Sequence, residues 1–206
     1  IGAWSADTFG ANWGEIQIWA FDAPTNLWVQ VGSDLGIENT QSRHPWFGYH
    51  VDISALGDFV IACSNKNTDQ QPAGFARVYT WPAMTVTTMV VPEEDTRFGW
   101  ATSLSGDGKV LAVGEYQYNN DSGQVVVYAW DGSAWQVRDT LSAQAEGDMF
   151  GASVVLNNDG SMLAVGETKH DSNATKDTGQ VCVYEWNGST YESHSCLLYT
   201  SDAADE

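Results

Sequence analysis

The sequence has 206 residues, with 27 Asp and Glu against 8 Lys and Arg, and its formal charge at pH 7 is −19. This balance argues against nucleic acids and anionic membranes as partners, because both are bound through clustered Lys and Arg. No apolar run reaches 18 residues, so no transmembrane helix is expected. The abundance of Gly, Val and aromatic residues, without a helical period, predicts an all-β protein.

A set of short motifs recurs along the chain every 51 to 52 residues. Each copy begins with Phe-Gly, at 47, 98 and 150, and continues with an apolar segment such as LAVGE, a polar loop and a segment like GQVVVYAW. An earlier partial copy begins at Ile1-Gly2, which matches the end of LAVG, and residues 14–21 match GQVVVYAW. The repeat predicts a partial unit over 1–46 and further units over 47–97, 98–149 and 150–195.

Each unit is predicted to hold four short strands, which in the third unit cover 100–105, 110–113, 124–130 and 135–141. Short turns separate them, and Asp131-Gly132 is a hairpin signal because Asp and Gly tolerate positive φ. A period near 50 with several strands per unit is typical of β-propellers, whose blades must stack to bury both faces. The predicted fold is a partial β-propeller with about three and a half to four four-stranded antiparallel blades.

The last residues, Cys196–Glu206 (CLLYTSDAADE), depart from the repeat. They resemble the conceptual translation of a sequencing-library adapter, so we expect a non-native tail in which Cys196 is not a native cysteine. Cys63 and Cys182 stand where other units have Val, and we expect both to be buried small apolar side chains. Because they fall in different strands of separate units, a disulfide between them is not expected.

Units of this length, with these motifs in this order, resemble FG-GAP repeats, the blades of the integrin α-subunit type of β-propeller. The match is carried by Phe98-Gly99, Gly114, Gly123 and Val127-Tyr128, and again by Phe150-Gly151, Gly166, Gly179 and Val183-Tyr184. The resemblance implies a propeller that is usually seven-bladed and most often an extracellular adhesion or ligand-binding module. A WD-repeat-like propeller is the second choice, because Trp130-Asp131 resembles its signature, although its period is nearer 40.

Many FG-GAP repeats carry a calcium loop of the D-x-D-x-D-G kind between their first two strands. Here the corresponding turns, Gly106–Gly108 and Asn158–Gly160, each offer one carboxylate, which is few for a cation that prefers several oxygen ligands. We expect tight hairpins at both turns, and neither calcium nor another cofactor.

Residues with catalytic or metal-binding chemistry are scattered. His44, His50, His170 and His194 show no zinc-type spacing, so no metal site and no catalytic residue is predicted. Glu115 and Glu167 take equivalent places in successive units, and we expect each to hydrogen-bond the loop that follows it.

Long connections are expected at one end of the blades, because the second connection of each meander and the link to the next blade meet there. Such variable loops on a repeating scaffold are typical of a binding surface. The candidate contact residues on it are Trp13, Trp46, Tyr116, Tyr118, Asp121 and Asp171. Packing of some of these aromatic side chains between blades is the alternative interpretation, foremost for Trp46.

The predicted function is a non-catalytic binding or adhesion module outside the cell, with a protein or glycan as its ligand. Three glycosylation sequons, at Asn120, Asn173 and Asn187, fit an extracellular setting. Two alternatives stay open at this point: an accessory propeller of a larger enzyme whose catalytic domain lies outside this sequence, and an intracellular WD-like scaffold.

Overall fold

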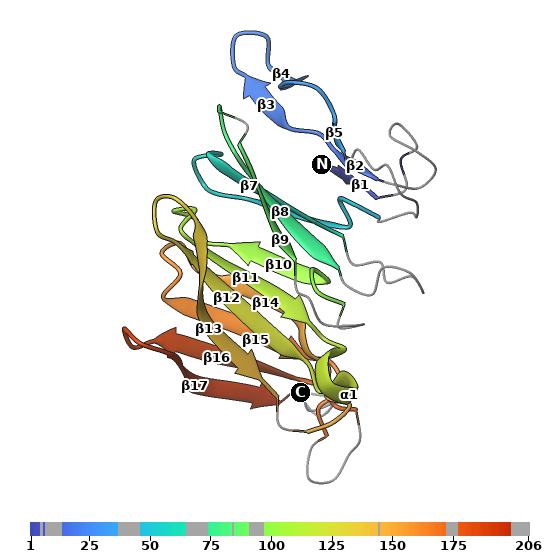
Figure 1. Cartoon of the computed structure of the whole chain (residues 1–206), viewed down its shortest axis with the longest axis vertical. Coiled ribbons are helices and arrows are strands. Elements are labelled where there is room, and N and C mark those ends of the chain that lie inside the picture. Colours follow the sequence, from blue (N-terminus) through green and yellow to red (C-terminus); the bar gives the residue numbers. More distant parts are fainter. Residues whose placement is uncertain are drawn as a thin grey trace, which may run out of the picture.

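The computed structural model describes residues 1–4, 6, 14–36, 46–64, 74–83, 85–90, 97–143, 145–171 and 177–198. These residues form strands β1 to β17 and a single short helical turn, so the prediction of an all-β protein is confirmed (Figure 1). In this described part, no helix has the length and apolar character needed to cross a membrane.

Three antiparallel sheets contain four strands each, paired in chain order. The first consists of β6 (His50–Ile53), β7 (Phe59–Ser64), β8 (Phe75–Thr80) and β9 (Val86–Val90). The second consists of β10 (Ala101–Leu104), β11 (Val110–Glu115), β12 (Gln124–Trp130) and β13 (Trp135–Ser142). The third consists of β14 (Phe150–Leu156), β15 (Met162–Glu167), β16 (Gln180–Trp186) and β17 (Tyr191–Leu198). The prediction of four-stranded antiparallel sheets is therefore confirmed for these three.

The N-terminal region is less regular. A three-stranded sheet contains β1 (Gly2–Ala3), β2 (Glu15–Ile16) and β5 (Leu35–Gly36), and a separate hairpin pairs β3 (Trp19–Asp22) with β4 (Leu27–Gln30). The single strand expected over 14–21 is thus interrupted between β2 and β3. The backbone there stays hydrogen-bonded, because the Gln17 N–H donates to the Ile1 carbonyl and the Val31 N–H to the Ile18 carbonyl, both at 2.8 Å.

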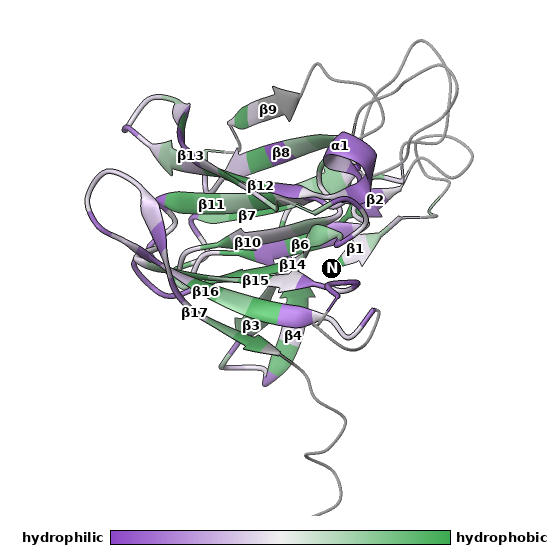
Figure 2. Cartoon of the chain, turned by 90° about the horizontal axis from the view of Figure 1, so that it is seen from below, coloured by the Kyte–Doolittle hydropathy of each residue, from purple (hydrophilic) through white to green (hydrophobic). Residues whose placement is uncertain are grey.

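The sheets stack face to face in chain order, from the N-terminal end to the C-terminal end (Figure 1). Successive side chains of a strand point to opposite faces of its sheet. Those of β11 therefore pack alternately against the two neighbouring sheets. Leu111 and Val113 pack toward the β6–β9 sheet, in a cluster with Ile61 and Val78. Val110 and Ala112 pack toward the β14–β17 sheet, in a cluster with Leu163 and Val165. Figure 2 shows β11 and β7 as largely hydrophobic ribbons, as strands covered on both faces should be.

The Phe-Gly dipeptides mark the start of each complete sheet. Phe47, Phe98 and Phe150 are buried, with at most 1% of their surface exposed. Each follows a link from the preceding sheet and lies in the core between the two. The isolated bridge between Gly123 and Phe150 joins the backbones of adjacent sheets directly. The repeated Phe-Gly motif is therefore a contact between sheets and not only a feature within one.

The two ends of the sheets differ. At one end lie short turns such as 105–109 and 131–134, while the other end carries the β11–β12 and β15–β16 connections and the link 143–149. The β11–β12 connection contains α1 (Tyr118–Asp121), a helical turn in which Asn119 and Asn120 have φ of 49° and 56°. Asn tolerates this left-handed region better than most residues. In Figure 2 the turn is drawn as largely hydrophilic.

Two cysteines behave differently from each other. Cys63 is a free, fully buried thiol, as expected of a small apolar side chain. Cys182 is buried, as expected, but it forms a disulfide with Cys196, which the sequence analysis did not anticipate. The reason is register: β17 continues to Leu198, and this places Cys196 directly opposite Cys182. Since Cys196 opens the adapter-like segment, this disulfide does not identify a redox compartment.

Candidate functional site

A groove of about 910 Å³ runs across the first strands of the three complete sheets. Strands β6, β10 and β14 line it side by side, together with the residues that follow each Phe-Gly. Polar side chains in its wall include His50, Asp52, Thr102, Ser103 and Ser153. The groove is therefore built from equivalent positions of successive repeats.

Most of the polar groups in this wall connect neighbouring sheets. The Asp52 carboxylate accepts a hydrogen bond from the Leu104 N–H at 2.7 Å, and the Ser103 hydroxyl accepts one from the Leu156 N–H at 3.1 Å. His50 Nδ1 lies 2.9 Å from the Thr102 hydroxyl. Burial lowers the pKa of His50 from its ordinary value, and the nearby Asp52 carboxylate opposes this only in part. These contacts explain the polar residues as inter-sheet hydrogen-bond partners.

Three aromatic rings form a row where the groove meets the end with the long connections. The Tyr49 and Trp100 ring centroids are 5.4 Å apart, and the Trp100 and Tyr116 centroids are 4.7 Å apart in an edge-to-face arrangement. All three side chains are half-buried, and Tyr49 and Trp100 also line the groove. This aromatic row joins two repeats, since Tyr49 belongs to the second unit and the other two to the third.

The candidate contact residues from the sequence fall in several places. Tyr116 lies in the aromatic row, whereas Trp46 packs edge to face against Trp4 with centroids 5.3 Å apart. Tyr118 and Asp121 are half-buried in α1. Asp171 is exposed, and its carboxylate accepts a hydrogen bond from the Asp177 N–H at 2.8 Å. Trp13 lies outside the described residues.

Sequence reasoning missed Tyr49 and Trp100. The sequence could have indicated them, because the residue directly after Phe-Gly is aromatic in two successive units, as Tyr49 and Trp100. In the next unit this residue is Ala152. Tyr49 and Trp100 lie directly before β6 and β10, the first strands of neighbouring sheets. Only the stacking of the sheets places the two rings in contact.

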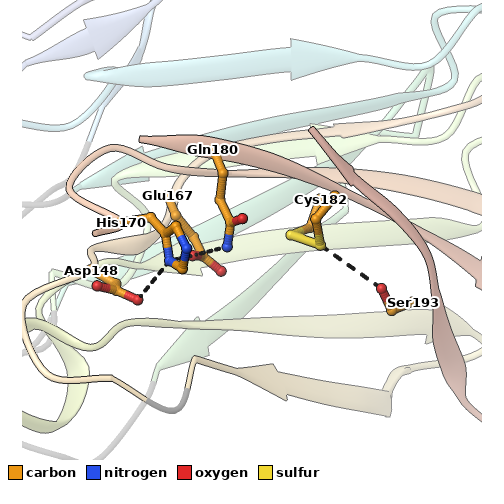
Figure 3. The surroundings of a disulfide bond; sticks show 7 residues. Asp148, Glu167, His170, Gln180, Cys182 and Ser193 are labelled. Carbon is orange, nitrogen blue, oxygen red and sulfur yellow. Dashed lines mark hydrogen bonds and ion pairs between the residues drawn. A yellow bond between two sulfur atoms is a disulfide. The ribbon is translucent and has the colours of Figure 1, made fainter. Parts of the chain in front are cut away.

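A second group of side chains lies at the same end of the β14–β17 sheet (Figure 3). His170 Nδ1 is 3.1 Å from the Asp148 Oδ2 and 3.2 Å from the Glu167 Oε2. Gln180 donates a hydrogen bond from Nε2 to the same Glu167 oxygen at 2.6 Å. Asp148 and Glu167 are buried, and His170 is half-buried. Glu167 therefore binds the loop that follows β15, as expected from the sequence.

The sequence did not indicate that these three residues meet. Asp148 lies near the end of the link between β13 and β14, Glu167 is the last residue of β15, and His170 lies three residues beyond it. The antiparallel pairing of Phe150 with Glu167 brings the two segments together. Glu115, the equivalent residue of the preceding unit, is fully buried. The pKa of Tyr128 is raised to about 12, mainly by burial of the Tyr128 side chain and further by the negative charge of Glu115.

No protein-family model matches the chain, and the curated proteins contain no sequence that is significantly similar to it.

Proposed function

We propose that the chain is part of an FG-GAP-type β-propeller that acts as a non-catalytic binding or adhesion module outside the cell. The repeating four-stranded meanders, stacked face to face with their first strands adjacent, support the propeller. The buried Phe-Gly contacts between sheets support the FG-GAP type, because they give the motif that carries the resemblance a structural purpose.

The observation that carries the binding role is the aromatic row of Tyr49, Trp100 and Tyr116 at the mouth of the groove. Packing holds half-buried aromatic rings in a fixed orientation, and such rings stack against sugar rings or serve as anchors in protein interfaces. The polar groups of the groove wall are engaged between sheets, which supports binding over catalysis. The ligand is a glycan or a protein that reaches the groove from the end with the long connections.

The charge of the chain narrows the ligand class. At a formal charge of −19, the surrounding field attracts cationic groups and repels anionic ones. Neutral glycans and proteins with a basic surface are therefore favoured over sulfated or sialylated glycans.

The proposal is tested by probing arrays of neutral glycans, acidic glycans and purified extracellular-matrix proteins with the labelled full chain. A hit is then measured with Trp100→Ala and Tyr116→Ala. Trp28→Ala is the matched control, because Trp28 lies on the β3–β4 hairpin, is 65% exposed and is not among the described residues that line the groove. Loss of a hot-spot aromatic costs about 2 kcal/mol, which is about a 30-fold loss of affinity.

The expected result is a hit among the neutral glycans or basic proteins that weakens by this factor in Trp100→Ala and is unchanged in Trp28→Ala. Binding that survives both Trp100→Ala and Tyr116→Ala contradicts the assignment to the aromatic row. An exclusive preference for acidic glycans contradicts the electrostatic part of the proposal.

A further inference from the structure

Asp148, Glu167 and His170 converge on one point between the link to β14 and the loop after β15, as Figure 3 shows. One atom from each side chain lies within 4.8 Å of the corresponding atoms of the other two. We propose that these three residues form a binding site for a divalent transition-metal cation, with Zn²⁺ as the best fit. This inference goes beyond the proposed binding function and does not depend on it.

The two separations that involve His170 Nδ1 match the edges of a metal coordination polyhedron. Zinc bonds to His nitrogen and carboxylate oxygen are about 2.0–2.2 Å long, so adjacent ligand atoms in tetrahedral or octahedral geometry lie about 3.0–3.4 Å apart. The Nδ1–Oδ2 and Nδ1–Oε2 distances of 3.1 and 3.2 Å fall within this range. The same nitrogen faces both carboxylates, and in the neutral ring it carries one hydrogen at most. A cation between the three atoms would satisfy both carboxylates together.

The negative charges of the two carboxylates also favour a bound cation. Asp148 and Glu167 are both more than nine-tenths buried, with 7% and 6% of their surface exposed. In the described part of the chain, the ion pairs of both carboxylates are made with His170. Even a protonated His170 would leave one negative charge between them, and burying an uncompensated charge is costly. A divalent cation offsets both carboxylates and leaves the imidazole neutral, the form that binds metals.

The donor set selects the class of metal. One imidazole nitrogen with two carboxylate oxygens suits Zn²⁺ and its neighbours in the first transition row, whereas Ca²⁺ takes six to eight oxygen ligands. Three protein ligands are also the number found in zinc sites that keep a position open. With three protein ligands, the remaining position would be taken by water or by a donor atom of a bound molecule.

The ligands are held in place by the surrounding backbone. The His170 carbonyl accepts hydrogen bonds from the Thr178 and Gly179 N–H groups at 3.0 and 3.1 Å, which closes the ends of the loop. The Asp148 carbonyl accepts one from the Lys169 N–H at 3.1 Å, which fixes the link against the loop. Gln180 orients Glu167, as outer-shell partners commonly orient metal ligands. Little rearrangement would therefore be needed when the cation enters.

The test is calorimetric titration of the full chain, first treated with a chelator and dialysed, with ZnCl₂ at pH 7.5. Parallel titrations use CaCl₂ and MgCl₂. The variants are His170→Gln and Asp148→Asn, which remove a ligand with little change in size. His194→Gln is the matched control, because His194 also faces a carboxylate, Glu185 at 3.7 Å, but both of these side chains are exposed. Near-ultraviolet circular dichroism verifies that each variant is folded.

We expect one Zn²⁺ per chain, bound more tightly than Ca²⁺ or Mg²⁺. His170→Gln and Asp148→Asn should each weaken Zn²⁺ binding at least tenfold, because even outer-shell substitutions at metal sites cost about 10- to 100-fold. His194→Gln should leave the affinity unchanged. Titration with Co²⁺ gives a second readout, a visible absorption band that His170→Gln removes.

Three outcomes would overturn the proposal. The first is the absence of saturable Zn²⁺ binding to the parent chain. The second is binding of equal affinity in His170→Gln and Asp148→Asn, which would place the metal elsewhere on the acidic surface. The third is equal affinity for Ca²⁺ and Zn²⁺. None of these outcomes bears on ligand binding at the aromatic row, so the two proposals fail independently.

Discussion

Gly123 and Phe150 touch through their backbones: a Cβ atom added to Gly123 would lie 2.1 Å from the Phe150 carbonyl oxygen. Gly123 opens the third strand of one sheet, and Phe150 belongs to the Phe-Gly motif of the next. The same contact recurs one repeat earlier, where a Cβ on Gly74 would lie 1.9 Å from the Phe98 carbonyl oxygen. Two motifs that look separate in the sequence are therefore the two sides of one junction between sheets.

We predict that Gly123→Ala strongly destabilises the protein. At φ of +86°, a Cβ is strained in itself, and here it would also collide with backbone. Together the two effects should cost about 3 kcal/mol or more of unfolding free energy. The control is Gly132→Ala, which has a φ of +101° but nothing within 4 Å of the added Cβ. It should cost only the strain, about 1 kcal/mol. Urea denaturation measures the difference, and equal losses would contradict the close contact.

A second prediction concerns Asp52, whose carboxylate receives the Leu104 N–H from the neighbouring sheet. Asp52→Ala should leave this buried donor without its acceptor and cost about 1–3 kcal/mol. Asp52→Asn retains an oxygen at the same place and should lose much less. Chemical denaturation of the two variants checks this, and a milder effect of Ala than of Asn would be inconsistent with the hydrogen bond.

The turn at Asp131 should contribute to the pH dependence of stability. Hydrogen bonds from the Ala134 and Ser133 N–H groups lower the pKa of Asp131 to about 2. Because the folded pKa is below that of the unfolded chain, the stabilisation is present above about pH 4 and is lost as pH falls toward 2. Asp131→Asn should remove this dependence and keep the turn at pH 7, since Asn187 makes the same backbone contacts at the equivalent position. Thermal melts between pH 2 and 7 compare the variant with the parent chain.

Cys63 should be unreactive in the folded protein. Complete burial raises the pKa of its thiol far above the ordinary value, so the thiolate that reacts is scarce and inaccessible. A thiol reagent at pH 8 should modify Cys63 only after urea unfolds the chain. Cys63→Val, which places there the residue of the third unit, should retain the fold and lose the reaction. Rapid labelling without denaturant would show that this core is open.

The repeat made the strands and their antiparallel order within each unit predictable, because Phe-Gly, LAVGE and the Val-rich segment recur with their turns. The prediction is wrong in the first unit, where the strand expected over 14–21 divides into β2 and β3. There the sequence match is limited to two short segments, Ile1-Gly2 and residues 14–21, and the strands that pair are shorter or fewer than in the other units.

The candidate sites were less accessible to sequence reasoning. Tyr116 was named, but Tyr49 and Trp100 were not, and Asp148 carried no motif at all. Side chains from separate repeats meet only when neighbouring sheets stack, and spacing along the chain does not encode which equivalent positions then touch. His170 shows this most clearly, since its carboxylate partners lie 3 and 22 residues before it.

The sequence by itself determined the all-β class, the four-stranded meanders and the position of the turns, because these depend on local alternation and on residues that tolerate positive φ. Tertiary structure decided the rest: that Gly123 and Phe150 form one junction, that three aromatic rings align at a groove, and that Asp148, Glu167 and His170 converge. The physical reason is that these features arise between sheets, where packing and burial act over distances that no local pattern records.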